Sequence, residues 1–211
     1  MRLTTITLGA AGLVTLLGST SALAAPPPAT RDITQVLAGT YRLDPLHSKV
    51  TWAVDHYGFS TYQGQFTAAS GTLALAEDPT RSQLTIQIPL DQVVTGSALD
   101  EHLAGDDFFD VAVNPIATFR STRITLAGDN QATIEGQLTL NGQTHPLTLD
   151  ATFNRAAVYP YDDTYRLGFD ADAEMRRSDW GIDFLLPKGS DGMGISDRVA
   201  LEIEAEFTPA H

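Results

Sequence analysis

The sequence predicts an all-β domain of about eight antiparallel strands with one short helical insertion. Apolar residues recur at every second position, turn residues separate these stretches, and the segment 97–110 alone loses the period of two. A period of two places successive side chains on opposite faces of a strand, so each stretch has one apolar and one polar face. Strands of this kind form antiparallel sheets that bury a single face. Together they are expected to enclose one apolar interior.

Turn residues separate the strands in chain order. Asp44-Pro45 precedes the first alternating stretch, and Glu77-Asp78-Pro79 follows the second predicted strand. Asn141-Gly142 predicts a tight hairpin, because both central residues of a type I′ turn need positive φ. This pattern leaves a closed barrel and a two-sheet sandwich equally open, since both hide one face of every strand. The alternation is clearest in the stretches 50–54, 84–90, 134–140, 147–153, 167–175 and 199–207.

Residues 1–24 precede this domain and have the features of a cleaved signal peptide. Arg2 gives a positive start, residues 6–17 are largely apolar, and Ala22-Leu23-Ala24 is a small-residue cleavage site. The apolar run is shorter than the ~20 residues that a membrane span needs. We therefore expect export to the periplasm, a mature chain that begins at Ala25, and no stable membrane insertion.

The next residues, 25–39, include Pro26-Pro27-Pro28 and show no apolar periodicity. This composition predicts a flexible linker. The folded domain is then expected to span residues 40–208.

The composition excludes several classes of function. With 13 basic and 26 acidic residues, the chain is too acidic for nucleic-acid binding to be expected. The absence of cysteine excludes thiol catalysis and thiolate metal sites. No G-x-S-x-G elbow or phosphate-binding glycine loop occurs, and the five histidines are not spaced as metal ligands. We therefore predict neither catalytic nor metal-binding residues and do not expect an enzyme.

The segment 97–110 is predicted to cap one end of the β structure. Ser97 is suited to begin a short helix and Gly105 to end it, and Phe108 and Phe109 follow. An apolar lumen needs apolar side chains at its open end to exclude water. The alternative is a surface crossover whose phenylalanines anchor it to the wall.

Several motifs, taken in order, resemble the YceI-like family of exported, lipocalin-like isoprenoid-binding proteins. The resemblance covers about residues 40–207. It implies a closed, elongated, antiparallel eight-stranded barrel whose pore holds a polyisoprenoid chain, which favours the barrel over the sandwich. The motifs that carry it are residues 41–50 (YRLDPLHSKV), 56–60 (HYGFS), Gly64, Phe66, Gly71, His102-Leu103, 107–110 (DFFD), Pro115, Phe119, Ser121, 136–142 (GQLTLNG) and 177–182 (RSDWGI).

The inner faces carry small residues beside bulky ones, which favours a lumen with room for a ligand. An eight-stranded barrel either just fills its interior or holds one small ligand. The alternative is that large and small residues interlock in a packed core. The small inward residues are Gly136, Ala151, Ala171, Ala173 and Ala205.

The predicted function is a periplasmic carrier that binds an isoprenoid quinone or a polyprenyl lipid and requires no cofactor. His56 and Arg177 are candidates for the lipid headgroup, although Arg177 could instead pair with Asp179 to fix its turn. The oligomeric state stays open, a homodimer included. The candidate lumen residues are Trp52, Val54, Phe66, Ile86, Ile88, Phe108, Phe109, Phe119, Leu138, Leu149, Phe169, Ala171 and Ile203.

Two other functions are compatible with the residues. One is an enzyme or redox accessory that acts on the bound isoprenoid quinone, with His102 and a neighbouring aspartate as acid–base groups. The other is a secreted protein whose outer surface binds a partner around a filled barrel. Turnover of a quinone would indicate the first, and an empty lumen the second.

Overall fold

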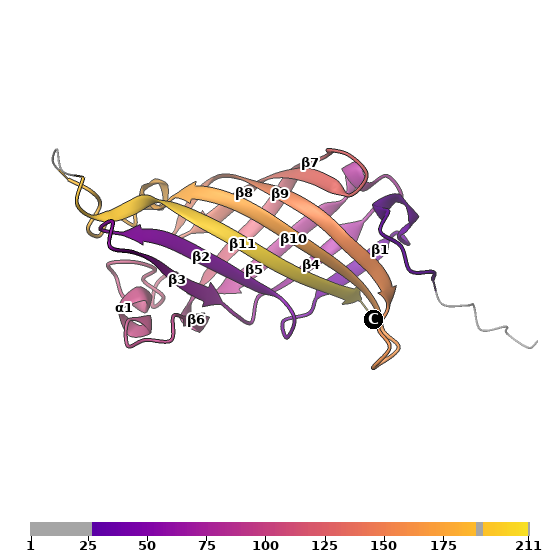
Figure 1. Cartoon of the computed structure of the whole chain (residues 1–211), viewed down its shortest axis with the longest axis horizontal. Helices are drawn as coiled ribbons and strands as arrows, with labels where there is room; N and C mark the ends of the chain where they lie inside the picture. Colours follow the sequence, from indigo (N-terminus) through magenta and orange to yellow (C-terminus); the bar gives the residue numbers. More distant parts are fainter. Residues whose placement is uncertain (1–26, 189–191, 211) are drawn as a thin grey trace, which may run out of the picture.

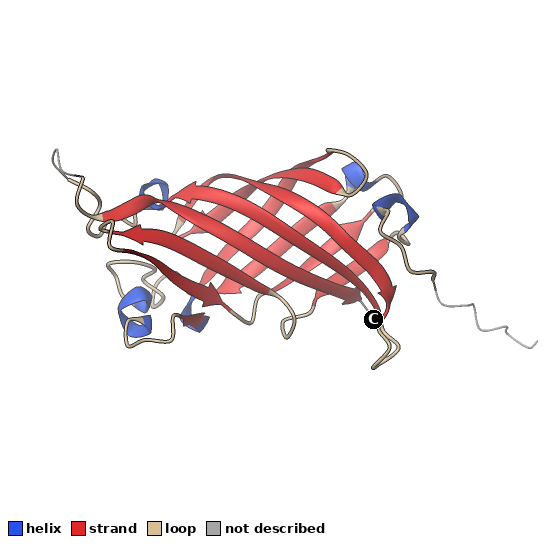
Figure 2. Cartoon of the chain, in the orientation of Figure 1, coloured by secondary structure: helices blue, strands red, loops and turns tan. Residues whose placement is uncertain are grey.

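The computed structural model describes residues 27–188 and 192–210, which form an elongated β-barrel with short helical turns at its ends (Figures 1 and 2). The predicted signal peptide, residues 1–24, lies outside the described residues. The strands are β1 (Gly39–Leu43), β2 (Lys49–His56), β3 (Ser60–Phe66), β4 (Ser70–Leu75), β5 (Gln83–Pro89), β6 (Val93–Val94), β7 (Ile116–Leu126), β8 (Gln131–Leu140), β9 (Gln143–Val158), β10 (Tyr165–Arg176) and β11 (Ile195–Pro209). The helical elements are η1 (Ile33–Gln35), η2 (Pro79–Arg81), η3 (Leu90–Gln92), α1 (Asp100–Ala104) and η4 (Arg177–Trp180).

The strands pair antiparallel in the order β1-β4-β5-β7-β8-β9-β10-β11-β2-β3-β6, and β1 also pairs with β11. Residues 195–204 of β11 pair with β2, and residues 207–209 pair with β1. In the same way, β3 and β4 continue one another, as do β5 and β6. The described strands therefore form a closed eight-stranded antiparallel barrel, as predicted.

The alternation in the sequence explains which side chains face inward. Leu147, Leu149, Ala151 and Phe153 of β9 are buried or nearly so, whereas the residues between them are more exposed. At the β8–β9 hairpin, Asn141 and Gly142 have φ values of 48° and 72°, which confirms the predicted turn.

The buried residues form two clusters along the barrel. One lies toward α1 and includes Trp52, Phe66, Leu90 and Trp180. The other lies toward η1 and includes Tyr41, Phe153 and Phe207. Figure 1 shows α1 and η1 at opposite ends of the long axis, so the molecule has an α1 end and an η1 end.

The second half of the segment predicted as a linker packs against the η1 end. Thr30 exchanges backbone hydrogen bonds with Ala156 of β9, at 2.8 Å in each direction. The Asp32 side chain accepts a hydrogen bond from the Thr34 N–H at the start of η1, which directs Ile33 into the barrel end. Ile33 and Val36 are buried in the cluster there. Ile33 and Val36 lie three residues apart, which places both side chains on one side of the 3₁₀ turn. This part of the segment therefore packs on the barrel instead of forming the predicted linker.

Candidate functional site

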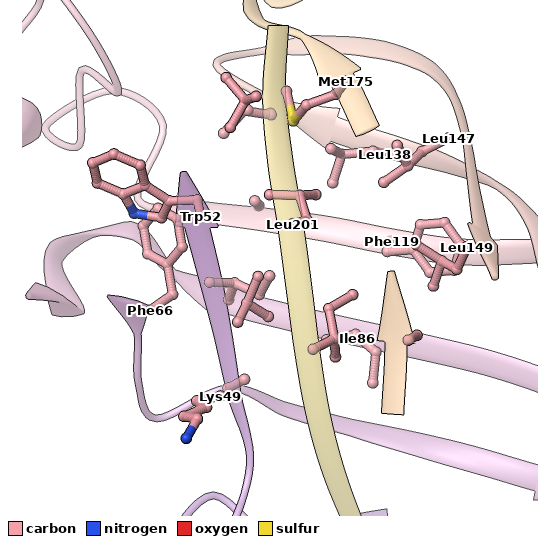
Figure 3. A pocket seen from close by; sticks show the side chains of 18 of the residues that line it. Lys49, Trp52, Phe66, Ile86, Phe119, Leu138, Leu147, Leu149, Met175 and Leu201 are labelled. Carbon is pink, nitrogen blue, oxygen red and sulfur yellow. The ribbon is translucent and has the colours of Figure 1, made fainter. Parts of the chain in front are cut away.

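A cavity of about 530 Å³ runs inside the barrel, and its wall is almost entirely apolar. Its volume falls in the range of pockets that bind small molecules, about 300–1,000 Å³. Figure 3 shows Trp52 and Phe66 on one side of the cavity and Phe119 and Leu149 on the other. The barrel is therefore hollow rather than filled by its own side chains.

Every lumen residue predicted from the sequence lines this cavity. They come from eight different strands and from the segment 97–110. The alternation placed the strand residues among them correctly, since a residue that faces inward on a closed barrel faces the lumen. These residues are Trp52, Val54, Phe66, Ile86, Ile88, Phe108, Phe109, Phe119, Leu138, Leu149, Phe169, Ala171 and Ile203.

The small inward residues contribute unequally to the cavity. Ala151, Ala171 and Ala205 line it. Gly136 does not, because the ring of Phe119 lies where its Cβ would be. At that position the alternative of interlocking large and small side chains holds.

Gly64 of β3 has the same relation to an aromatic ring. It is opposite Trp52 of β2, and the indole ring occupies the place of its missing side chain. The two strands pair in a regular register here, and the glycine permits the close approach of the indole ring. The two glycines thus hold Phe119 and Trp52 flat against the wall and keep the centre open.

The segment 97–110 covers the α1 end of the cavity. Leu99 and Leu103 line the cavity together with both predicted phenylalanines. Gly105 ends α1 as predicted. The prediction that Ser97 caps the helix is wrong: Leu99 is the N-cap residue, without a side-chain cap, and the Ser97 Oγ accepts a hydrogen bond from the Leu99 N–H.

The two predicted phenylalanines have different surroundings. Phe109 is buried, and its ring centroid lies 5.4 Å from that of Phe66 on β3. Phe108 is half-buried and lies 5.2 Å from Phe184, in the loop after η4. Phe109 therefore joins the segment to the wall, whereas Phe108 joins it to a second loop.

The cavity reaches the surface between these two segments. Leu99 and Leu185 both line the cavity, and they are 47% and 46% exposed. A side chain that touches both the lumen and the solvent marks an opening. Phe184 and Leu185 were missed by the sequence analysis, because the loop that carries them has no period from which an inward position could be read.

His102 lies in this opening among aromatic rings. Its ring is 5.1 Å from Phe108 and 5.2 Å from Phe184, edge to face in both cases. The three rings form a cluster between α1 and the late loop. These neighbours are apolar and offer no carboxylate to support the acid–base role considered above.

Arg177 borders the cavity but is engaged by the backbone. It is 5% exposed, and its Nε, Nη1 and Nη2 donate to the carbonyls of Ser196, Ile182 and Ile195 at 2.7–2.9 Å. Burial lowers its pKa, while the charge of Asp197 acts in the opposite direction. Arg177 thus ties the loop after η4 to β11, and these carbonyls take the place of the Asp179 partner expected from the sequence.

His56, the other headgroup candidate, lines the cavity at the end of β2. Its ring packs against Tyr57 at 5.0 Å and Tyr62 at 6.5 Å. The Tyr62 hydroxyl is 3.0 Å from the Ser97 Oγ, which joins β3 to the α1 segment. A polar rim therefore exists at the α1 end, and His56 belongs to it.

A separate polar cluster lies outside the lumen, where the β1–β2 loop meets β10 and β11. Arg166 donates to Asp44 at 2.7 Å, Glu206 at 3.0 Å and Asp162 at 2.8 Å, and its guanidinium stacks on Tyr159. Asp44, His47 and Glu206 could together hold a metal ion by their geometry. The guanidinium of Arg166 already supplies the positive charge there. We therefore assign this cluster to the fold.

None of the helices in the described part of the chain has the length and apolar character that crossing a bilayer requires.

Comparison with known protein families identifies a YceI-like domain in this chain. The family model for this domain matches residues 41–207, nearly all of the barrel. A UPF0312 protein of Pseudomonas aeruginosa is 35% identical over 152 residues, which cover 70% of this chain and 78% of the relative. A UPF0312 protein of Pseudomonas syringae pv. tomato is 34% identical over 152 residues, 70% of this chain and 79% of the relative.

Solved structures show the same barrel. The YCEI protein of Campylobacter jejuni superposes with a TM-score of 0.62 at 25% identity, covering 74% of this chain and 90% of that one. BcnA of Burkholderia cenocepacia gives 0.66 at 21% identity, covering 78% and 98%. A polyisoprenoid binding domain from Saccharophagus degradans gives 0.58 at 15% identity, covering 82% and 100%. At the two lower identities the likeness concerns the fold alone. Because the family model spans most of the chain and the relatives exceed 30% identity over most of their length, the chain belongs to the YceI-like family.

Proposed function

We propose that this protein binds a polyisoprenoid lipid, an isoprenoid quinone or a polyprenyl chain, in its barrel lumen and carries it through the periplasm. The observation that supports this most directly is the long apolar cavity that opens at the α1 end between Leu99 and Leu185. A cavity of this kind has little affinity for water, since water needs polar partners in a buried site.

The chemistry of the wall fits a hydrocarbon chain. A prenyl tail offers no hydrogen-bonding groups, and the wall is built from aliphatic and aromatic side chains such as Ile86, Phe119 and Leu149. Burying apolar surface contributes about 25 cal/mol for each Å² removed from water. Affinity would then come from the length of tail enclosed, and selectivity from the shape of the cavity.

The headgroup would lie at the α1 end. His56 and the Tyr62 hydroxyl form part of the polar rim there, next to the opening. His56 is the better headgroup candidate of the two predicted, because Arg177 already donates to three backbone carbonyls. A tail in the lumen with the headgroup at the rim suits both a quinone and a polyprenyl lipid.

Two further observations support the two parts of the proposal, lipid binding and a periplasmic location. The Saccharophagus protein of the same fold is described as a polyisoprenoid binding domain. The N-terminal sequence has a short apolar run that ends in Ala22-Leu23-Ala24, as in exported proteins.

The proposal is tested by purifying the protein without detergent from the periplasm of its own host and identifying the extracted lipid by mass spectrometry. We expect a polyisoprenoid in near-equal amount to the protein. Recovery of an empty barrel, or of straight-chain fatty acids alone, would contradict the proposal. Incubating the bound quinone with the protein and a redox partner tests the alternative of turnover in the same preparation.

A further inference from the structure

A second, smaller cavity of about 70 Å³ lies inside the barrel beyond the lumen. The two cavities share part of their walls, which places them end to end. Each shared residue comes from a different strand, β4, β7, β8, β9 and β10 in turn. The shared residues are Leu73, Ile124, Ile134, Ala151 and Phe169.

The second cavity extends to the η1 end. Ile33 of η1 and Pro79 of η2 line it, together with Leu75 of β4 and Leu126 of β7. Its wall is mostly apolar, like that of the lumen. The interior of the barrel is therefore one channel divided in two, and the larger part opens at the α1 end.

Phe169 of β10 is the largest of the shared side chains. Its ring lies 5.2 Å from that of Phe153 on β9 and 5.9 Å from that of Phe207 on β11. The register between β10 and β9 shifts at Gly168 and Phe169, so that Phe169 faces Phe153 directly. This bulge keeps both rings pointing inward at the same level of the channel.

The three rings differ in which cavity they touch. Phe153 lines the second cavity, Phe207 lines the lumen, and Phe169 lines both. Phe153 and Phe207 are each 3% exposed, whereas Phe169 is half-buried and has free space on both sides. Phe169 is thus the partition that an extended chain in the lumen would meet.

We propose that Phe169 sets the length of polyisoprenoid that the barrel accepts, by closing the lumen short of the second cavity. This inference rests on the proposed function. A tail that enters at the α1 end would fill the lumen until its last isoprene unit reaches the ring of Phe169. Longer tails would leave apolar units outside in water, and this limits their affinity.

The test is the affinity of purified, delipidated protein for all-trans prenyl alcohols of increasing length, from geranylgeraniol to solanesol and beyond. We expect the affinity of the parent to reach a maximum at one length. Phe169→Ala joins the two cavities, so the maximum should move to longer alcohols, which should bind at least about tenfold tighter than they bind to the parent. Phe169→Leu, a milder change for folding, should move it less in the same direction.

Two control variants separate the partition from a general loosening of the η1 end. Phe153→Ala removes an equally large ring from the second cavity alone and should leave the preferred length unchanged. Ala132 of β8 lines the second cavity without lining the lumen. Adding Ala132→Phe to Phe169→Ala refills that space and should restore the preference of the parent.

The possible failures are distinguishable. If the parent binds prenyl alcohols but Phe169→Ala and Phe169→Leu, both folded, keep its preferred length, this inference is wrong and the proposed function stands. A shift of the same size in Phe153→Ala would also overturn it. If the parent binds no prenyl alcohol of any length, the proposed function fails and the inference fails with it.

Discussion

The two ends of the barrel are closed by different kinds of residue. At the α1 end, Phe108 and Phe184 project from segments outside the strands, beside the half-exposed Leu99. At the η1 end, Phe153 and Phe169 project from neighbouring strands of the sheet. Loop side chains can move without breaking the strand ladder, whereas strand side chains are fixed by it. This difference supports the proposals that lipid enters at the α1 end and that its length is limited toward the η1 end.

Each end also depends on one arginine, and the two arginines have different partners. Arg177, near the α1 end, donates to backbone carbonyls, which do not titrate. Arg166, near the β9–β10 hairpin, pairs with the carboxylates of Asp44, Glu206 and Asp162. Carboxylates lose their charge in acid. Acid should therefore weaken the contacts of Arg166 more than those of Arg177.

The largest effect is expected from Arg177→Ala. It removes the donor from one buried and two partly buried carbonyls, and each buried group left unsatisfied costs about 1–3 kcal/mol. We expect the free energy of unfolding to fall by at least about 3 kcal/mol in urea titrations. Arg176→Ala is the matched control, since the Arg176 side chain is 73% exposed and pairs only with Asp197 among the described residues. It should cost less than about 1 kcal/mol.

The same pair of variants sharpens the assignment of the headgroup. If Arg177 held the lipid rather than the loop, Arg177→Ala would lose lipid and keep its stability. His56→Ala should show that result instead, with weaker lipid binding and little loss of stability.

The next effect concerns the lumen between the two ends. Ala171 lines the cavity, and Ala171→Phe would place a ring inside it. We expect bound lipid to fall by about tenfold or more while the barrel stays folded, because the new side chain enters free space. If the position were packed, the change would instead cost about 1–3 kcal/mol of stability. Asp172→Phe, on the outer face of the same strand, should change neither lipid content nor the fold.

A smaller effect is expected at the opening. Phe108→Ala breaks the cluster with His102 and Phe184 and should speed exchange of a fluorescent prenyl lipid several-fold. Phe109→Ala should leave the exchange rate less changed and mainly lower stability, because its ring is buried against Phe66. Equal exchange rates in Phe108→Ala and the parent would show that the segment is a fixed crossover and not a mobile cap.

The contrast between the ends also explains what could be predicted from the sequence. Alternation located the lumen residues of the strands, such as Ile86, Leu138 and Ile203, because a closed barrel converts a period of two directly into inside and outside. It also placed Phe169 inside. It could not show that Phe169 divides two cavities, since that depends on the bulge opposite Phe153 and on Ile33 of η1, which lines the second cavity.

Irregular segments carried less information. Phe184 and Leu185 reach the cavity through the turn that Arg177 holds, and this turn depends on carbonyls of Ile182 and Ile195 that any residue would supply. The cluster around Arg166 was missed for a related reason. Its carboxylates come from positions 44, 162 and 206, which only the closure of the barrel brings together.

The smallest effect should depend on pH and involve Asp44, one of the carboxylates that pair with Arg166. Burial acts to raise the pKa of Asp44, but hydrogen bonds from His47, the Leu46 N–H and Arg166 outweigh it and hold this pKa below the ordinary value of 3.8. A carboxylate with a lowered pKa in the folded state stabilises that state above the unfolded pKa and loses this contribution as the pH falls. Asp44→Asn should therefore lower the free energy of unfolding by about 1–2 kcal/mol at neutral pH.

The difference between Asp44→Asn and its parent should shrink as the pH falls below the ordinary pKa of an aspartate, because the protonated side chain resembles the amide. Urea titrations of both proteins across this range measure it. Asp172→Asn serves as control, since this outward carboxylate has Asp150 and Glu202 as its cross-strand neighbours and should lose no stability. A constant difference at every pH would mean that Asp44 acts through shape rather than charge. In that case the two ends would be anchored alike, by hydrogen-bond geometry that does not titrate.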